Sequence, residues 1–197
     1  MHKKHFTKRK KKKQAKIIRY ARIIHRKMAI FLFIFIFIIS LSGLFLGWKK
    51  NSVGKILPKT HQGTSSEFNK WLDLDSLHKT AIRILHDSIN ENLSPELSKI
   101  DIRKNKGVAK FIFENHYWEI QLDGASGELL NIARRNSDLI ENIHDGSILD
   151  KLAGTNGILK LIYTSIIGLT LLLFTLTGFW LWYGPKKIKK KKELNSN

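Results

Sequence analysis

The sequence contains no cysteine, which excludes disulfide bonds, thiolate metal sites and cysteine nucleophiles. Acidic residues are also missing where positive charge is concentrated. Residues 1–27 carry 13 Lys and Arg and no Asp or Glu, and residues 186–197 carry six Lys and one Glu. Residues 28–185 are nearly neutral, with 16 basic and 15 acidic residues. The net charge of +19 therefore belongs to two tails and does not by itself indicate a nucleic-acid-binding protein.

Charge is absent from two long apolar runs. Met28 to Gly47 contains no charged residue, and neither does Leu161 to Tyr183. At about 1.5 Å of rise per residue, each run is long enough to cross the roughly 30 Å core of a bilayer. Both are apolar on all sides, unlike a soluble amphipathic helix. We therefore predict transmembrane helices at 28–48 and 158–184, the first of them an anchor without a signal-peptidase site.

The flanking residues predict the orientation of the two helices. Basic clusters remain in the cytoplasm, so Lys10, Lys11, Lys12 and Lys13 before the first helix and the lysines after the second place tails 1–27 and 185–197 inside. Trp180 and Trp182 are typical of a membrane interface. The basic tails suit anionic lipids, and the absence of interleaved aromatic residues favours lipid over nucleic acid as their partner.

The region between the helices predicts a small α+β domain on the outer side. Residues 49–66 have the Gly, Ser and Thr content of a linker. Apolar residues then recur at helical spacing over 67–93, with Asp75 or Ser76 as the expected N-cap. Alternation with a period of two follows, broken by turn sequences at 105–107 and 123–127. The expected domain, at 67–136, is a helix packed on a three- or four-stranded antiparallel meander.

A second amphipathic stretch follows the domain. Leu139, Ile140, Ile143, Ile148 and Leu149 recur at helical spacing, which predicts a juxtamembrane segment over 137–157. We expect Gly154 and Gly157 to end it before the second transmembrane helix.

Three stretches resemble a known family. The first is 111–133, with YWEI at 117–120 and LDGASGELL at 122–130. The second is RIIHRK at 22–27 leading into SLSG at 40–43. The third is RNSDLIENIHDGS at 135–147, followed by LTGFWLW at 176–182. In these motifs and in their order, the chain resembles PepSY-associated transmembrane proteins.

The resemblance implies a protein of the bacterial inner membrane. Longer relatives with more spans are linked to the reduction of iron siderophores and to haem, and soluble PepSY domains are linked to the restraint of peptidases. Neither activity follows automatically for a chain with two spans.

Two histidines, His25 and His144, fall in the resembling motifs. Neutral imidazole is a good iron ligand, so haem b is the cofactor to consider, although nothing in the sequence requires a cofactor. The predicted topology puts the two on opposite sides of the bilayer, roughly 30 Å apart, so they would form separate sites. Otherwise His25 anchors at the interface and His144 pins the juxtamembrane segment. His144 with Asp145, near Asp138, Glu141 and Asp150, is the candidate metal site.

No catalytic constellation or phosphate-binding loop is present. We therefore expect a non-enzymatic protein whose outer domain binds or regulates a partner. The alternative is an accessory to haem- or iron-linked electron transfer or uptake. Gly43 and Gly47 have the spacing that lets membrane helices approach closely, which favours span–span packing or a homodimer.

Overall fold

The computed structural model describes the backbone of residues 2–193 and the side chains of residues 12–189. It divides into two compact units, one of Met1–Leu41 with Asp145–Asn197 and the other of Ser42–His144. The side chains of Lys10 and Lys11, predicted to set the topology, lie outside the described side chains.

The second unit contains a four-stranded antiparallel sheet in the order β1-β2-β3-β4, which confirms the predicted α+β meander. The sequence alternation places successive side chains on opposite faces. Gly107 closes the first turn at a φ of 68°, and Gly127 closes the last at 73°, a region that glycine enters without strain. The strands are β1 (Leu97–Arg103), β2 (Val108–Phe113), β3 (Trp118–Asp123) and β4 (Leu129–Arg134).

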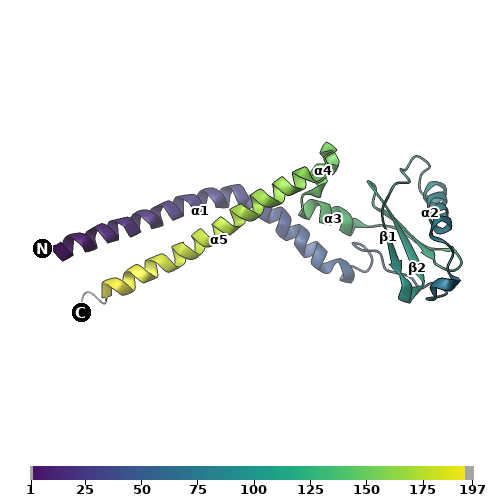
Figure 1. Cartoon of the computed structure of the whole chain (residues 1–197), viewed down its shortest axis with the longest axis horizontal. Coiled ribbons are helices and arrows are strands. Elements are labelled where there is room, and N and C mark those ends of the chain that lie inside the picture. Colours follow the sequence, from purple (N-terminus) through teal and green to yellow (C-terminus); the bar gives the residue numbers. More distant parts are fainter. Residues whose placement is uncertain (1, 194–197) are drawn as a thin grey trace. The chain divides into compact units, whose positions relative to one another are not determined.

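One face of the sheet packs against helix α2 (Leu74–Ser88), as Figure 1 shows. Leu77, Ala81 and Leu85 face the sheet from successive turns of α2, and each is at most 1% exposed. They form the hydrophobic core of the domain with residues of β2 and β3, namely Ala109, Phe111, Phe113, Ile120 and Leu122. Burying side chains of this kind contributes about 1.5–3 kcal/mol for each large one.

The start of α2 differs from the prediction. The helix begins at Leu74, and residues Phe68–Lys70 form a separate 3-10 turn, η2. Asp73 is the N-cap, since its Oδ1 accepts a hydrogen bond of 2.9 Å from the Ser76 amide. The predicted caps, Asp75 and Ser76, lie inside the first turn.

The opposite face of the sheet is covered by the segment that was predicted as a linker. The His61 amide donates to Oε1 of Gln121, and Gln121 donates from Nε2 to the Lys59 carbonyl. The Gly63 amide donates to the Lys106 carbonyl at 2.7 Å. This covering segment, residues 59–64, therefore packs as part of the domain.

The first unit contains helix α5 (Ile158–Glu193) and helix α1 (His2–Trp48) as far as Leu41, and the two run antiparallel over their contacts. A Cβ on Gly178 would lie 3.2 Å from Cε1 of His25, and one on Gly184 would lie 3.4 Å from Cδ1 of Ile18. Nearer the other end of α5, the rings of Phe35 and Tyr163 lie 6.0 Å apart. Both helices are long and apolar enough to cross a membrane, and only 11% and 6% of their most apolar stretches are buried by protein.

The predicted juxtamembrane segment forms two helices, α3 (Asn136–His144) in the second unit and α4 (Ser147–Ala153) in the first. Gly146 precedes α4 with a φ of 78°. A Cβ at this position would lie 2.4 Å from the Tyr163 ring, so glycine is required both by the backbone and by the close approach.

Candidate functional site

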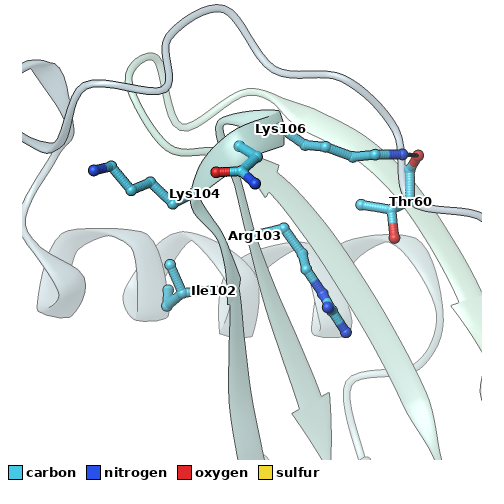
Figure 2. Close-up of a pocket in the computed structure, with 6 residues that line it drawn as sticks. Thr60, Ile102, Arg103, Lys104 and Lys106 are labelled. Atoms are coloured by element: carbon cyan, nitrogen blue, oxygen red, sulfur yellow. Dashed lines mark hydrogen bonds between the residues drawn. The ribbon is translucent and has the colours of Figure 1, made fainter.

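A basic pocket opens on the domain beside η3 (Lys104–Lys106), the turn between β1 and β2. Its volume is about 460 Å³. Figure 2 shows Lys106 reaching Thr60 of the covering segment, while Lys104 and Arg103 point in different directions. The lining residues are Thr60, Ile102, Arg103, Lys104, Asn105 and Lys106.

The basic side chains of this pocket differ in the partners that they contact. Lys106 donates to the Thr60 carbonyl at 3.0 Å, and Arg103 pairs with Asp101 at 2.7 Å. Lys104 lies over the Phe68 ring, 5.3 Å from its centroid, which leaves its charge facing solvent. The pocket thus combines positive charge with one exposed apolar lining residue, Ile102, which is 39% exposed. Phe68, which lies under Lys104, is outside the lining and is 54% exposed.

Beneath the covering segment, the sheet buries an ionic network around Glu119 of β3. Glu119 is fully buried, and its two oxygens accept from Gln121 at 2.7 Å and from Arg135 at 2.5 Å. Lys110, 2% exposed, lies 3.5 Å from the same carboxylate. Burial lowers the pKa of Lys110, because the loss of hydration outweighs the attraction of Glu119.

The network continues towards α3 through Asp138. Arg135 contacts both oxygens of Asp138 at 3.1 Å, and Lys99 of β1 contacts one of them at 3.1 Å. Burial alone raises the pKa of Asp138, but Arg135, Lys99 and the Ser137 hydroxyl together hold it below its ordinary value. The network thereby fixes the start of α3 to the sheet.

Asp123, at the end of β3, holds the covering segment. Its carboxylate accepts from the amide and hydroxyl of Thr64 at 2.8 and 3.1 Å and from the Ala125 amide at 2.8 Å. Burial raises the pKa of Asp123, but these donors outweigh it and the pKa lies below its ordinary value. Asp123 therefore serves as a structural anion that joins the segment to the turn.

His25 is a junction between the two long helices of the first unit. Its Nδ1 lies 3.0 Å from Oγ1 of Thr177 and 3.2 Å from the Phe174 carbonyl. Its ring stacks on that of Phe174, with centroids 4.1 Å apart. The absence of a side chain on Gly178 leaves room for the imidazole.

His144, the last residue of α3, makes the equivalent contact in the second unit. Its Nδ1 lies 3.0 Å from the hydroxyl of Ser42, which is 6% exposed. A Cβ on Gly43 would be 3.4 Å from Cε1 of His144. Each histidine is thus held by a neighbouring pair of residues, a hydroxyl residue followed by glycine.

These residue pairs lie within two of the motifs on which the resemblance rests, SLSG at 40–43 and LTGFWLW at 176–182. The family model described as PepSY-associated TM region matches residues 22–195. The chain belongs to this family. With its two exposed apolar helices, it is therefore a membrane protein of the PepSY type. Neither a search of curated proteins nor a search of solved structures found a match.

The acidic residues next to His144 have partners of their own in this PepSY-type protein. Asp145 forms an ion pair with Lys160 and accepts from the Ser147 amide at 2.9 Å. Asp150 accepts from the Leu159 and Lys160 amides and thereby caps α5. Over the residues whose side chains are described, no group of three or more His, Asp or Glu is arranged to hold a metal ion.

The other predicted residues are dispersed. Gly43 contacts His144, whereas nothing lies within 4 Å of a Cβ placed on Gly47. Trp180 and Trp182 are exposed on α5, and Lys186 lies 4.0 Å above the Trp182 ring. Lys12 and Lys13 are exposed on α1. The role of these residues in membrane interaction stays a prediction.

Sequence reasoning missed the network around Glu119. Lys110, Glu119 and Gln121 occupy the polar positions of alternating strands, which ordinarily face solvent. The covering segment that buries them lies about 60 residues earlier in the chain and has a composition typical of a loop. Arg135 and Asp138 at the spacing i, i+3 were a visible signal, but this spacing is common on exposed helices.

Proposed function

We propose that this PepSY-type protein resides in the bacterial inner membrane, with both termini in the cytoplasm and the domain outside. The support is the distribution of charge. Thirteen basic residues precede the first span and six follow the second, and positive charge close to a span remains in the cytoplasm. A reporter enzyme that is active only outside the cytoplasm, fused after Asn197, tests this orientation. The fusion is expected to be inactive, because the proposal places the C-terminus in the cytoplasm.

We propose further that the domain is a non-enzymatic binding module for a protein partner. One observation carries this proposal, namely the open basic pocket, in which Lys104 pairs with no carboxylate among the described side chains and Ile102 is exposed, with the exposed Phe68 ring under Lys104. Such a surface suits an extended acidic segment that also carries an apolar side chain, because charge complementarity steers association and apolar contact holds the complex.

The interior of the domain supports a binding role rather than catalysis. Glu119, Asp123 and Asp138 are each engaged by two or more donors. The pKa values of Asp123 and Asp138 are lowered, so both stay ionised at neutral pH. A general acid needs a pKa near the working pH, which these environments oppose.

Crosslinking in intact cells tests the pocket. A photoreactive amino acid at Asn105, within the pocket, is expected to capture a protein partner outside the cytoplasm. Capture is expected to fall when Lys104→Glu reverses the charge. The matched control is Arg83→Glu, which reverses an exposed charge on α2, away from the pocket. Equal loss in both variants, or no adduct at Asn105, would contradict the proposal, and an adduct of two copies would identify a homodimer.

A second candidate function is haem- or iron-linked electron transfer or uptake. One observation favours it, because in the described part of the chain both His25 and His144 form their hydrogen bonds through Nδ1. That arrangement leaves Nε2 available as a ligand, as in many metal-bound histidines. Purification from cells supplied with haem, followed by absorbance spectroscopy, decides it: the absence of a Soret band removes this candidate.

A further inference from the structure

A groove lies between the polar ends of α1 and α5, both in the first unit. The N-terminal part of α1 and the C-terminal part of α5 lie side by side (Figure 1), and the close contact of Ile18 with Gly184 forms one boundary of the groove. Beyond this contact the helices leave a space of about 450 Å³. Its apolar lining consists of Ala15, Ile18, Pro185 and Ile188.

The remaining lining of the groove is basic. Arg19 and Arg22 come from α1 and Lys189 from α5, and all three are exposed. Neither helix contains an acidic residue from His2 to Trp48 or from Ile158 to Lys192, so no described side chain of these two helices supplies a counter-charge to the groove. Glu193, the last residue of α5, lies outside the described side chains. Asp145 and Asp150 engage Lys160 and the amides at the opposite end of α5, about 45 Å away along its axis.

The groove lies at the level where the apolar run of α5 ends. That run stops at Tyr183, and Trp182 and Lys186 of the next turn form a cation–π contact, an arrangement typical of a membrane interface. A ligand here meets hydrocarbon on one side and water on the other. The lining has a related division, since Ile18 and Ile188 are half-buried while Arg19, Arg22 and Lys189 are exposed.

We propose that this groove is a binding site for the headgroup of an anionic phospholipid. Arg19, Arg22 and Lys189 supply the donors for the phosphate, and guanidinium groups suit phosphate because they donate two parallel hydrogen bonds. Ile18 and Ile188 contact the first carbons of an acyl chain. This site is distinct from the diffuse attraction of the tails to a negative surface, which does not depend on where each lysine lies. It is independent of the function proposed for the domain.

The test is native mass spectrometry of the full-length chain, stripped of lipid in detergent and titrated with phosphatidylglycerol or phosphatidylethanolamine. The groove variant combines Arg19→Gln, Arg22→Gln and Lys189→Gln. The control variant removes the same number of charges outside the groove, by Lys12→Gln, Lys13→Gln and Lys187→Gln. Glutamine retains helix propensity in both. A further arm adds soluble glycerol phosphate as a competitor.

We expect the wild-type chain to prefer phosphatidylglycerol and the groove variant to lose about tenfold or more of this preference, since even one hydrogen bond to a charged group contributes roughly a factor of ten. The control is expected to change by about threefold or less. Equal losses in both variants overturn the proposal, because the attraction is then diffuse. Displacement of the lipid by submillimolar glycerol phosphate also overturns it, because the ligand is then a soluble phosphate.

Discussion

Replacing Glu119 by Gln tests whether the buried ionic network holds the domain together. The substitution keeps the shape of the side chain and removes its charge, so Lys110 and Arg135 lose their shared counter-ion. Lys110 stays buried without this partner, whereas Arg135, whose side chain is 11% exposed, keeps its pair with Asp138. Breaking a buried ion pair by removing one partner costs about 3–5 kcal/mol. Small domains are stable by about 5–15 kcal/mol in total, so the variant is expected to lose a large part of the stability of the domain.

Hydrogen exchange of the full-length protein in detergent measures this loss. Peptides that cover residues 108–123 report on β2 and β3, and a loss of 3–5 kcal/mol raises the open fraction by about two to four powers of ten. The control is Glu67→Gln, which breaks an exposed pair with Lys70 and is expected to cost about 1 kcal/mol or less. Adding Lys110→Met to Glu119→Gln is expected to recover part of the loss, because the unpaired ammonium is removed.

A loss for Glu119→Gln no larger than that for Glu67→Gln would refute the reasoning. It would mean that water reaches the carboxylate and that the covering segment does not seal this face of the sheet. A double variant less stable than the single one would also contradict the argument, since it would show that Lys110 stabilises the domain without its partner.

Three further predictions follow from close contacts and from charge. Gly124→Ala is expected to lower the free energy of unfolding by about 1–3 kcal/mol in urea titrations, because its Cβ would lie 2.2 Å from the Trp71 ring. Ile18→Cys with Gly184→Cys is expected to form an intramolecular disulfide on oxidation, seen on non-reducing gels, because the native chain has no cysteine and a Cβ on Gly184 would lie 3.5 Å from Cγ1 of Ile18, the atom that a cysteine sulfur would replace. The pKa of Asp123 is lowered in the folded state, so its stabilisation is present above the unfolded pKa of about 3.9 and is lost as the pH falls through the lower folded pKa. Unfolding midpoints of the wild type and Asp123→Asn, measured from about pH 6 to pH 2, are expected to converge at the acid end.

Each of these predictions has an outcome that contradicts it. An unfolding energy of Gly124→Ala within about 0.5 kcal/mol of the wild type, the range of neutral surface substitutions, would show that Trp71 does not pack there. Pairing Ile18→Cys with Gly168→Cys is the control, since Gly168 has no neighbour within 4 Å of a Cβ. Equal crosslinking of both pairs would contradict the antiparallel contact. A constant difference between the two midpoints over the whole acid range would contradict the role of the Asp123 charge.

The four strands and the core face of α2 could be predicted from the sequence, because periodicity reports directly which side chains are buried. Leu77, Ala81 and Leu85 recur at helical spacing and all three lie in the core. The start of α2 was less well predicted, since Asp73, Asp75 and Ser76 are all good N-caps. The choice depends on backbone angles, and Asp73 has a φ of −64° and a ψ of 152°, outside the helix.

The turn between β2 and β3 shows where local pattern fails. Tyr117 continues the alternating pattern of residues 118–122, but it has a φ of 59°, and β3 begins at Trp118. A tyrosine is unfavourable in this conformation by about 1–2 kcal/mol. Contacts from a distant helix hold it, since the Asn142 side chain donates to its hydroxyl at 2.9 Å. The local propensity of Tyr117 cannot predict this conformation, because the contact that holds it comes from a residue 25 positions later in the chain.

The histidine motifs have a physical explanation that requires no cofactor. An imidazole in an apolar helix, or against one, leaves a polar nitrogen without water, and that nitrogen must find a partner. Thr177 and Ser42 supply a hydroxyl at 3.0 Å, and the glycine that follows each of them lets the ring approach the helix. Histidine, hydroxyl and glycine therefore act together. Loss of the hydroxyl leaves the imidazole nitrogen without this partner, and a side chain in place of the glycine crowds the imidazole ring.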